Sequence, residues 1–129
     1  MPFNALLVDD DSAILQTLKS VFETRDFNVS TAVSAFDAAR SLARFSFDLV
    51  VTDMRMEHET AGFEVVRHAK SCSCRPVVII LSAYPIPVSE WRNAGADGMF
   101  MKGGGIFRIL DDIELLLKSK QKSAAAEHE

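Results

Sequence analysis

Five polar side chains that can take part in chemistry stand directly after short aliphatic runs: Asp9, Asp10, Asp53, Ser82 and Lys102. Crowded carboxylates repel one another, so aspartates that are brought together favour a bound cation. Magnesium prefers oxygen ligands and commonly uses carboxylates together with water and phosphate. A carboxylate can also act as the nucleophile that forms an aspartyl phosphate, while a lysine and a hydroxyl stabilise phosphoryl oxygens. These residue types together indicate magnesium-assisted phosphoryl transfer.

Each of these residues taken alone also has an ordinary structural interpretation. An aspartate after a strand is often a helix cap, a serine there is often a turn residue, and a lysine is usually a solvated surface group. Their shared position, each just after an aliphatic run, favours the functional interpretation.

The aliphatic runs alternate with helical patterns along the whole chain. The predicted strands cover Ala5–Val8, Phe27–Ala32, Leu49–Thr52, Val77–Leu81 and Gly98–Met101. Helical spacing of apolar residues, or a helix-capping residue, predicts helices near 14–22, 35–42, 63–70, 89–94 and 106–117. Continuous aliphatic strands that are each followed by a helix predict an α/β fold, a doubly wound five-stranded parallel sheet with five flanking helices. We expect the strand order 2-1-3-4-5, with the functional side chains at the carboxyl ends of the strands.

Composition limits the classes of function. The 129 residues fit one domain, and 48% hydrophobic with 25% charged residues is typical of a soluble globular protein. A net charge of -4 gives no reason to expect nucleic-acid binding. No apolar run approaches the roughly 20 residues that span a membrane, and the first residues lack a basic start, so we expect a cytoplasmic protein. The polar, alanine-rich segment 119–129 is expected to be a disordered tail.

Cys72 and Cys74 allow two interpretations. Together with His68 they could hold a metal, but three loosely spaced ligands match no zinc pattern. Two free thiols at a helix end is the favoured interpretation.

From about Phe3 to Lys118 the chain resembles the receiver domain of two-component response regulators, a family with a flavodoxin-like fold, of which the chemotaxis regulators are an example. The similarity is carried by four segments, each of which runs through the end of a predicted strand: Leu7-Val8-Asp9-Asp10-Asp11, Asp48-Leu49-Val50-Val51-Thr52-Asp53-Met54-Arg55-Met56, Ile80-Leu81-Ser82-Ala83 and Gly95-Ala96-Asp97-Gly98-Met99-Phe100-Met101-Lys102. The resemblance implies a signalling domain rather than an enzyme with an external substrate.

The resemblance also implies roles for individual residues. Asp53 would accept a phosphoryl group from a histidine kinase or a histidine phosphotransfer protein. Asp9 and Asp10 would hold magnesium together with Asp53 and the backbone carbonyl of Arg55. Ser82 and Lys102 match the switch hydroxyl and the lysine of the family. A downstream protein partner, and a homodimer through the face formed by the fourth helix, fifth strand and last helix, are further expectations.

The chain departs from the family pattern at several positions. Glu57 and Gly103 stand where prolines are usual, and Ala61 stands where an acidic residue usually precedes the glycine, here Gly62. Met99 stands in place of the aromatic switch residue, which predicts a smaller conformational change on phosphorylation.

Two further side chains are expected to lie over the mouth of the site. Arg55 and Tyr84 are each two residues past a site residue, Asp53 and Ser82. Between them they are expected to keep water from an aspartyl phosphate. Arg55 could instead pair with Glu57 or Glu59 at the surface.

Two alternative functions belong to other classes. A phosphohydrolase of the haloacid dehalogenase type also uses aspartates and a lysine on a parallel sheet, and Asp9-x-Asp11 faintly resembles its first motif. A degenerate receiver would instead bind partners without being phosphorylated. Turnover of a small phosphate ester favours the first, and failure to take up acetyl phosphate with magnesium favours the second.

Overall fold

The computed structural model describes residues 2–127, and the side chains of residues 2–122. A single parallel sheet has the order β2-β1-β3-β4-β5, which confirms the predicted fold and strand order. Its strands are β1 (Asn4–Val8), β2 (Asn28–Ala32), β3 (Leu49–Thr52), β4 (Val77–Ser82) and β5 (Gly98–Met101). The helices are α1 (Ser12–Glu23), α2 (Ala35–Arg44), α3 (Ala61–Ser71), α4 (Val88–Ala94) and α5 (Ile106–Glu127).

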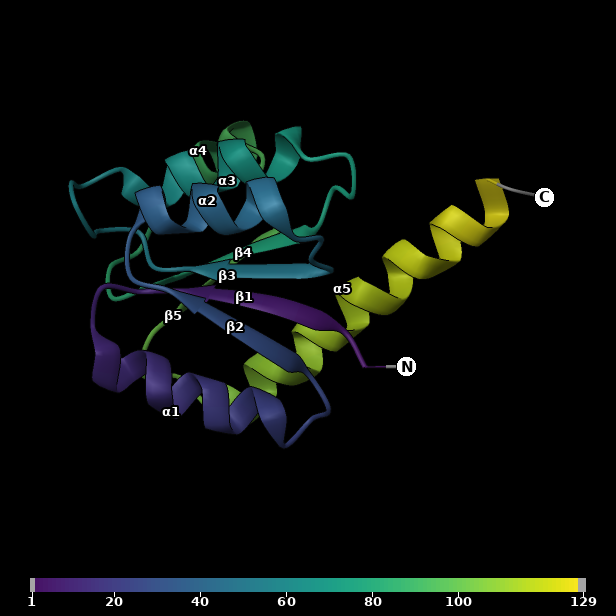
Figure 1. Cartoon of the computed structure of the whole chain (residues 1–129), viewed down its shortest axis with the longest axis horizontal. Coiled ribbons are helices and arrows are strands. Elements are labelled where there is room, and N and C mark those ends of the chain that lie inside the picture. The colour runs from purple at the N-terminus through teal and green to yellow at the C-terminus, as the bar shows by residue number, and fades with distance from the viewer. Residues whose placement is uncertain (1, 128–129) are drawn as a thin grey trace.

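Helices cover both faces of the sheet, with α2, α3 and α4 on one face and α1 and α5 on the other (Figure 1). Alternate strand residues therefore enter two separate cores. Leu6 and Val50 pack in the core under α2 and α3, while Leu7 and Val51 pack in the core under α1 and α5. This burial on both faces explains why the central strands are continuously aliphatic.

Short polar contacts and a glycine set the limits of three helices. The Asp11 side chain accepts hydrogen bonds from the Ala13 and Ile14 amides and caps α1. The Ser34 hydroxyl accepts one from the Asp37 amide and caps α2, as its position in the sequence indicates. Gly95, with φ of 103°, ends α4 in the left-handed conformation that favours glycine.

The C-terminal helix is longer than expected. The helix predicted to end near Lys118 continues to Glu127 in α5, through most of the segment expected to be a disordered tail, while 128–129 lie outside the described residues. Alanine, lysine, glutamine and glutamate are strong helix formers, and no glycine or proline interrupts this segment. The last turns of α5 extend past the amino edge of the sheet (Figure 1).

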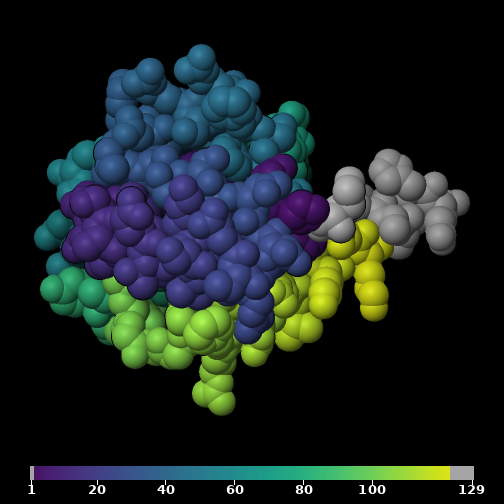
Figure 2. Space-filling view, turned by 60° about the horizontal axis from the view of Figure 1, so that its bottom comes forward, coloured from purple at the N-terminus to yellow at the C-terminus, as the bar shows by residue number. Residues whose placement is uncertain are grey.

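Side-chain contacts also connect α1 and α5, the two helices that cover the same face of the sheet. Figure 2 shows α1 and the first half of α5 side by side on one surface. Arg25, just after α1, contacts Asp111 at 3.0 Å and Glu114 at 3.3 Å, and its guanidinium lies 5.6 Å from the centre of the Phe107 ring.

Within residues 2–127, no helix is long and apolar enough to cross a membrane.

Candidate functional site

Three aspartates meet at the carboxyl edge of the sheet. Asp9 and Asp10 follow β1, and Asp53 follows the neighbouring strand β3, because the pairing places Val8 beside Thr52. One carboxylate oxygen from each lies within 4.8 Å of the others. Asp9 is buried, Asp53 is partly buried and Asp10 is exposed, so the cluster opens to solvent on the side of Asp10.

Lys102 joins two of these carboxylates. Its ammonium nitrogen lies 2.8 Å from Asp9 Oδ2 and 3.3 Å from Asp53 Oδ1. Burial and the nearby charge of Asp9 raise the pKa of Asp53, and Lys102 offsets this only in part. Burial lowers the pKa of Lys102, but its hydrogen bond with Asp9 and the charge of Asp53 outweigh burial and raise it above its usual value. Lys102 is therefore a fixed positive charge in the site.

Backbone amides orient the carboxylates. Asp9 Oδ1 accepts a hydrogen bond of 2.9 Å from the Asp11 amide, and Asp53 Oδ1 accepts one of 2.8 Å from the Met54 amide. Asp11 itself belongs to the cap of α1, not to the cluster. Asp11, the second aspartate of the Asp9-x-Asp11 pattern that faintly resembles the hydrolase motif, therefore caps a helix.

This donor set fits a hard divalent cation. All three side chains offer oxygen, and their mutual repulsion is relieved by only one lysine. Magnesium usually takes one or two carboxylates and keeps several waters, which suits a cluster with one exposed member. Among the described residues this is the one group of three or more histidine, cysteine or acidic residues close enough to hold an ion. Cys72 and Cys74 are free thiols, as favoured from their spacing.

Ser82 ends β4, next to β3 in the sheet. It is 2% exposed, and its hydroxyl accepts a hydrogen bond of 3.0 Å from the Tyr84 amide. Among the described residues, no hydrogen bond joins Ser82 to the aspartates. Met99 on β5 is partly buried and packs against the core under α2, α3 and α4.

Arg55 and Tyr84 form a stacked pair. The Arg55 guanidinium lies 4.1 Å from the centre of the Tyr84 ring, within the range of a cation–π interaction. The Tyr84 side chain is 54% exposed, so the pair lies at the surface. Among the described side chains, Arg55 forms no ion pair with Glu57 or Glu59.

Glu57 has a structural role that its position in the sequence did not suggest. Its carboxylate accepts hydrogen bonds from the Ala35 amide at 2.9 Å and the Phe36 amide at 3.1 Å, at the start of α2. These bonds outweigh burial and lower the pKa of Glu57. A glutamate in a loop is not by itself a signal for such a contact, because the partner amides lie 21 and 22 residues away in sequence.

Comparison with known proteins shows the family. The sequence model of the response regulator receiver domain matches residues 5–114. The chain belongs to the response regulator receiver family. This makes it a signalling domain, and the family binds magnesium at an acidic pocket that corresponds to the aspartate cluster here. The hydrolase alternative is therefore wrong.

Individual relatives agree with this assignment. The response regulator MprA of Mycobacterium leprae is 30% identical over 125 residues, covering 95% of this chain and 54% of that protein. The alginate biosynthesis transcriptional regulatory protein AlgB of Pseudomonas putida is 37% identical over 79 residues, covering 61% of this chain and 17% of that protein. The match thus spans about half the length of the Mycobacterium leprae regulator and less than a fifth of the length of the Pseudomonas putida regulator.

Solved structures show the same fold. A CheY-like receiver domain protein from Methanospirillum hungatei is 26% identical with a TM-score of 0.86, covering 95% of this chain and 99% of that one. This receiver domain differs from the family pattern after Lys102, where Gly103 has φ of 87° and the peptide before it is trans. Glycine adopts this left-handed conformation readily, and a proline at Gly103 could not, because its ring holds φ near −65°.

Proposed function

We propose that this receiver domain takes a phosphoryl group onto Asp53 from a phosphohistidine of a kinase or phosphotransfer protein. The observation that carries the proposal is the contact of Lys102 with both Asp9 and Asp53 inside a cluster of three carboxylates. A partly buried carboxylate with a fixed cation beside it and further oxygen donors suits nucleophilic phosphoryl transfer.

In the proposed reaction an oxygen of Asp53 attacks phosphorus, the phosphorus–nitrogen bond to histidine breaks, and the histidine ring leaves with the electron pair. Lys102 holds the Asp53 oxygen in place and meets the charge of the incoming phosphoryl group. Asp9, Asp10, Asp53 and the Arg55 carbonyl would hold magnesium, which would neutralise charge on the transferred oxygens when bound. Ser82, whose Oγ accepts a hydrogen bond from the Tyr84 amide, would donate its hydroxyl hydrogen to a phosphoryl oxygen.

The test is phosphorylation by acetyl phosphate with magnesium, read by intact-protein mass spectrometry. We expect the wild type to gain one phosphoryl group and Asp53→Asn to gain none. Asp26→Asn is the matched control, because Asp26 is an exposed carboxylate in the turn after α1. Undiminished labelling of Asp53→Asn would refute the proposal that Asp53 is the phosphate acceptor. A wild type that takes up no phosphate would favour a receiver that binds partners without phosphorylation.

The output of this reaction is proposed to be altered contact with a downstream protein, or dimerisation, through the face of α4, β5 and α5. Met99 packs against the core and is more flexible than the ring it replaces, so its inward and outward positions differ little in energy. We therefore propose a weak switch across this face. Large shifts throughout it in NMR spectra with beryllofluoride and magnesium would contradict this. The proposed location is the cytoplasm.

A further inference from the structure

The amino edge of the sheet, opposite the aspartates, contains two neighbouring cavities. One, of about 230 Å³, lies between the start of β1, the segment before β3 and the end of α5. The other, of about 300 Å³, lies between the α3–β4 loop and α5. Lys120 lines both cavities and therefore stands between them. Because it lies on the extension of α5, it falls outside residues 5–114, the part that matches the family.

Three cations lie around these cavities, and two of them have no partner in the described structure. Lys70 is paired with Asp97 at 2.6 Å. Among the described side chains, neither Arg75 nor Lys120 forms an ion pair. Partial burial and the positive charge of Lys70 lower the pKa of Lys120, and the nearby Asp97, Cys74 and Asp48 offset this only in part. Among the residues that line the two cavities, three cations stand against two carboxylates, Asp48 and Asp97, in a chain of net charge -4.

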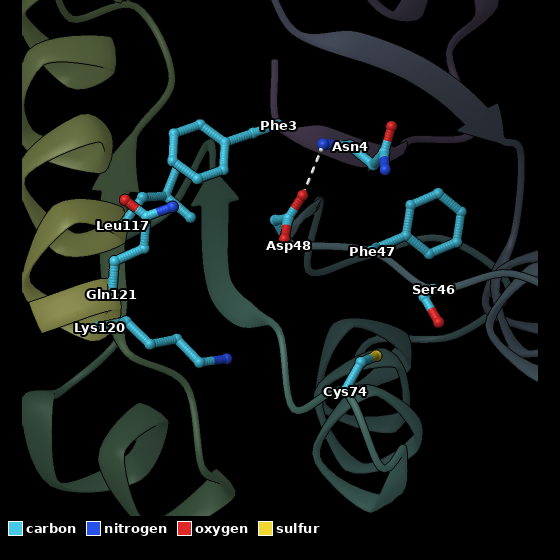
Figure 3. Close-up of a pocket in the computed structure, with 9 residues that line it drawn as sticks. All are labelled: Phe3, Asn4, Ser46, Phe47, Asp48, Cys74, Leu117, Lys120 and Gln121. Carbon is cyan, nitrogen blue, oxygen red and sulfur yellow. Dashed lines mark hydrogen bonds between the residues drawn. The ribbon is translucent and has the colours of Figure 1, made fainter. Parts of the chain in front are cut away.

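The two carboxylates nearby are already engaged. Asp97 accepts hydrogen bonds from Lys70 and from the Val78 amide at 2.8 Å. Asp48 accepts one of 2.8 Å from the Asn4 amide (Figure 3). Amide hydrogen bonds do not neutralise a carboxylate, so after Lys70 pairs with Asp97 and Asp48 balances one further cation, one positive charge is left to meet another anion.

An apolar wall adjoins the cations. Phe3, Phe47 and Leu117 line the first cavity together with Lys120, and of these three apolar side chains Phe3 is partly exposed while Phe47 and Leu117 are buried. Figure 3 shows the Phe3 ring beside Leu117, and the Lys120 side chain reaching from α5 into the space towards Cys74. A ligand that fills this space would need an apolar body of limited size and an acidic group at one end.

We propose that this edge binds a small anion with an aromatic or aliphatic body. Its carboxylate, sulfonate or phosphate group would lie between Arg75 and Lys120, and its body would lie against the partly exposed Phe3 ring. The site is separate from Asp53, since it lies at the other end of the strands. The proposal does not depend on phosphorylation.

The probe is naphthalene-2-sulfonate, which cannot transfer a phosphoryl group, added to nitrogen-15-labelled full chain without magnesium. We expect saturable NMR shifts at the amides of Phe3, Asp48, Cys74 and Lys120, and none around Asp53. Arg75→Gln and Lys120→Gln should each weaken binding about three- to fivefold, the effect of one exposed charge pair. Lys118→Gln is the matched control, because Lys118 is an exposed lysine of α5 outside both cavities.

Three outcomes would overturn the proposal. The first is an absence of saturable shifts at these amides. The second is equal affinity in Lys120→Gln and Lys118→Gln, which would remove the role of Lys120. The third is that inorganic sulfate binds as tightly as the probe, which would show that the apolar residues do not contribute to binding. Both lysines and Arg75 are exposed, so the variants are expected to keep the fold, and unchanged spectra away from this edge will verify it.

Discussion

Arg55 and Tyr84 bring a charge and a ring together in the loops after β3 and β4, which also carry the proposed phosphorylation site. Each follows a site residue by two positions, and their stacking at 4.1 Å joins the loop after β3 to the loop after β4. Arginine can also form a forked, charge-assisted contact with phosphoryl oxygens, and the ring can exclude water. Neither side chain offers a carboxylate or amide that would orient an attacking water.

The expected consequence is a long-lived aspartyl phosphate. Arg55→Asn combined with Tyr84→Glu should speed the decay of phospho-Asp53 by about tenfold, a change of roughly 1.4 kcal/mol in barrier height. Arginine could also stabilise the transition state, but Lys102 and magnesium already meet that charge, so we expect obstruction to dominate. Decay is followed by mass spectrometry after the phosphodonor is removed. Tyr84→Phe keeps the ring and should decay like wild type. A double variant with unchanged decay would show that this pair does not shield the phosphate.

At the scale of elements, Glu57 connects the loop after Asp53 to the start of α2. Glu57→Gln should lower the free energy of unfolding by about 0.5–1 kcal/mol, the lower part of the range for helix caps, because the side chain is exposed. The pKa of Glu57 is lowered in the folded protein, so its contribution is present above the unfolded value near 4.5 and is lost as pH falls through the folded value. Urea unfolding at neutral pH and at low pH measures this. Glu59→Gln is the control, and a difference that persists unchanged at low pH would contradict the ionised contact.

Gly62 fixes how closely α3 approaches β3. A Cβ atom there would lie 2.6 Å from the Asp53 carbonyl oxygen and 2.8 Å from Met54 Cα, both backbone atoms that cannot move aside cheaply. Gly62→Ala should therefore destabilise the fold by about 1–3 kcal/mol and slow phosphorylation, since it displaces the backbone of Asp53. Gly104→Ala is the control, because its nearest neighbour would be 3.5 Å away. Thermal unfolding and acetyl phosphate labelling give the two readouts. Wild-type stability in Gly62→Ala would contradict the close approach.

At the scale of the whole molecule, magnesium should stabilise the folded chain, because the aspartates come together only on folding. At a concentration 100 times its Kd the gain is about 2.7 kcal/mol, measured as a rise in thermal stability. Asp9→Asn with Asp10→Asn should lose most of this gain, while Asp26→Asn should keep it. In the absence of metal, Asp10→Asn should cost little, since Asp10 is exposed, whereas Asp9→Asn removes the contact with Lys102. An undiminished gain in the double variant would contradict the metal site.

The architecture and the edge of the sheet that carries the site could both be predicted from residue types and their order. Continuous aliphatic runs such as Leu49-Val50-Val51 are satisfied by burial on both faces, so the parallel sheet and its two helical layers could be predicted. The strand order was expected from the arrangement usual for an α/β chain of this length, and the structure has that order. Parallel strands end at one edge, so Asp9, Asp10, Asp53 and Lys102 could be expected to meet. Helix limits were less accurate where propensity alone decides, as α5 shows beyond Lys118.

Which of these groups are in contact, and what the other polar residues do, became visible in the folded chain alone. Asp9, Asp10 and Asp11 are three consecutive residues of the same type. Asp11 nevertheless accepts hydrogen bonds from amides of α1 and does not belong to the aspartate cluster. Glu57 reaches amides 21 and 22 residues away, and Lys120 lines cavities on both of its sides. Such contacts depend on side-chain direction and on how closely elements pack, to a fraction of an ångström. Residue type and periodicity carry information about burial and strand direction, but not about those distances.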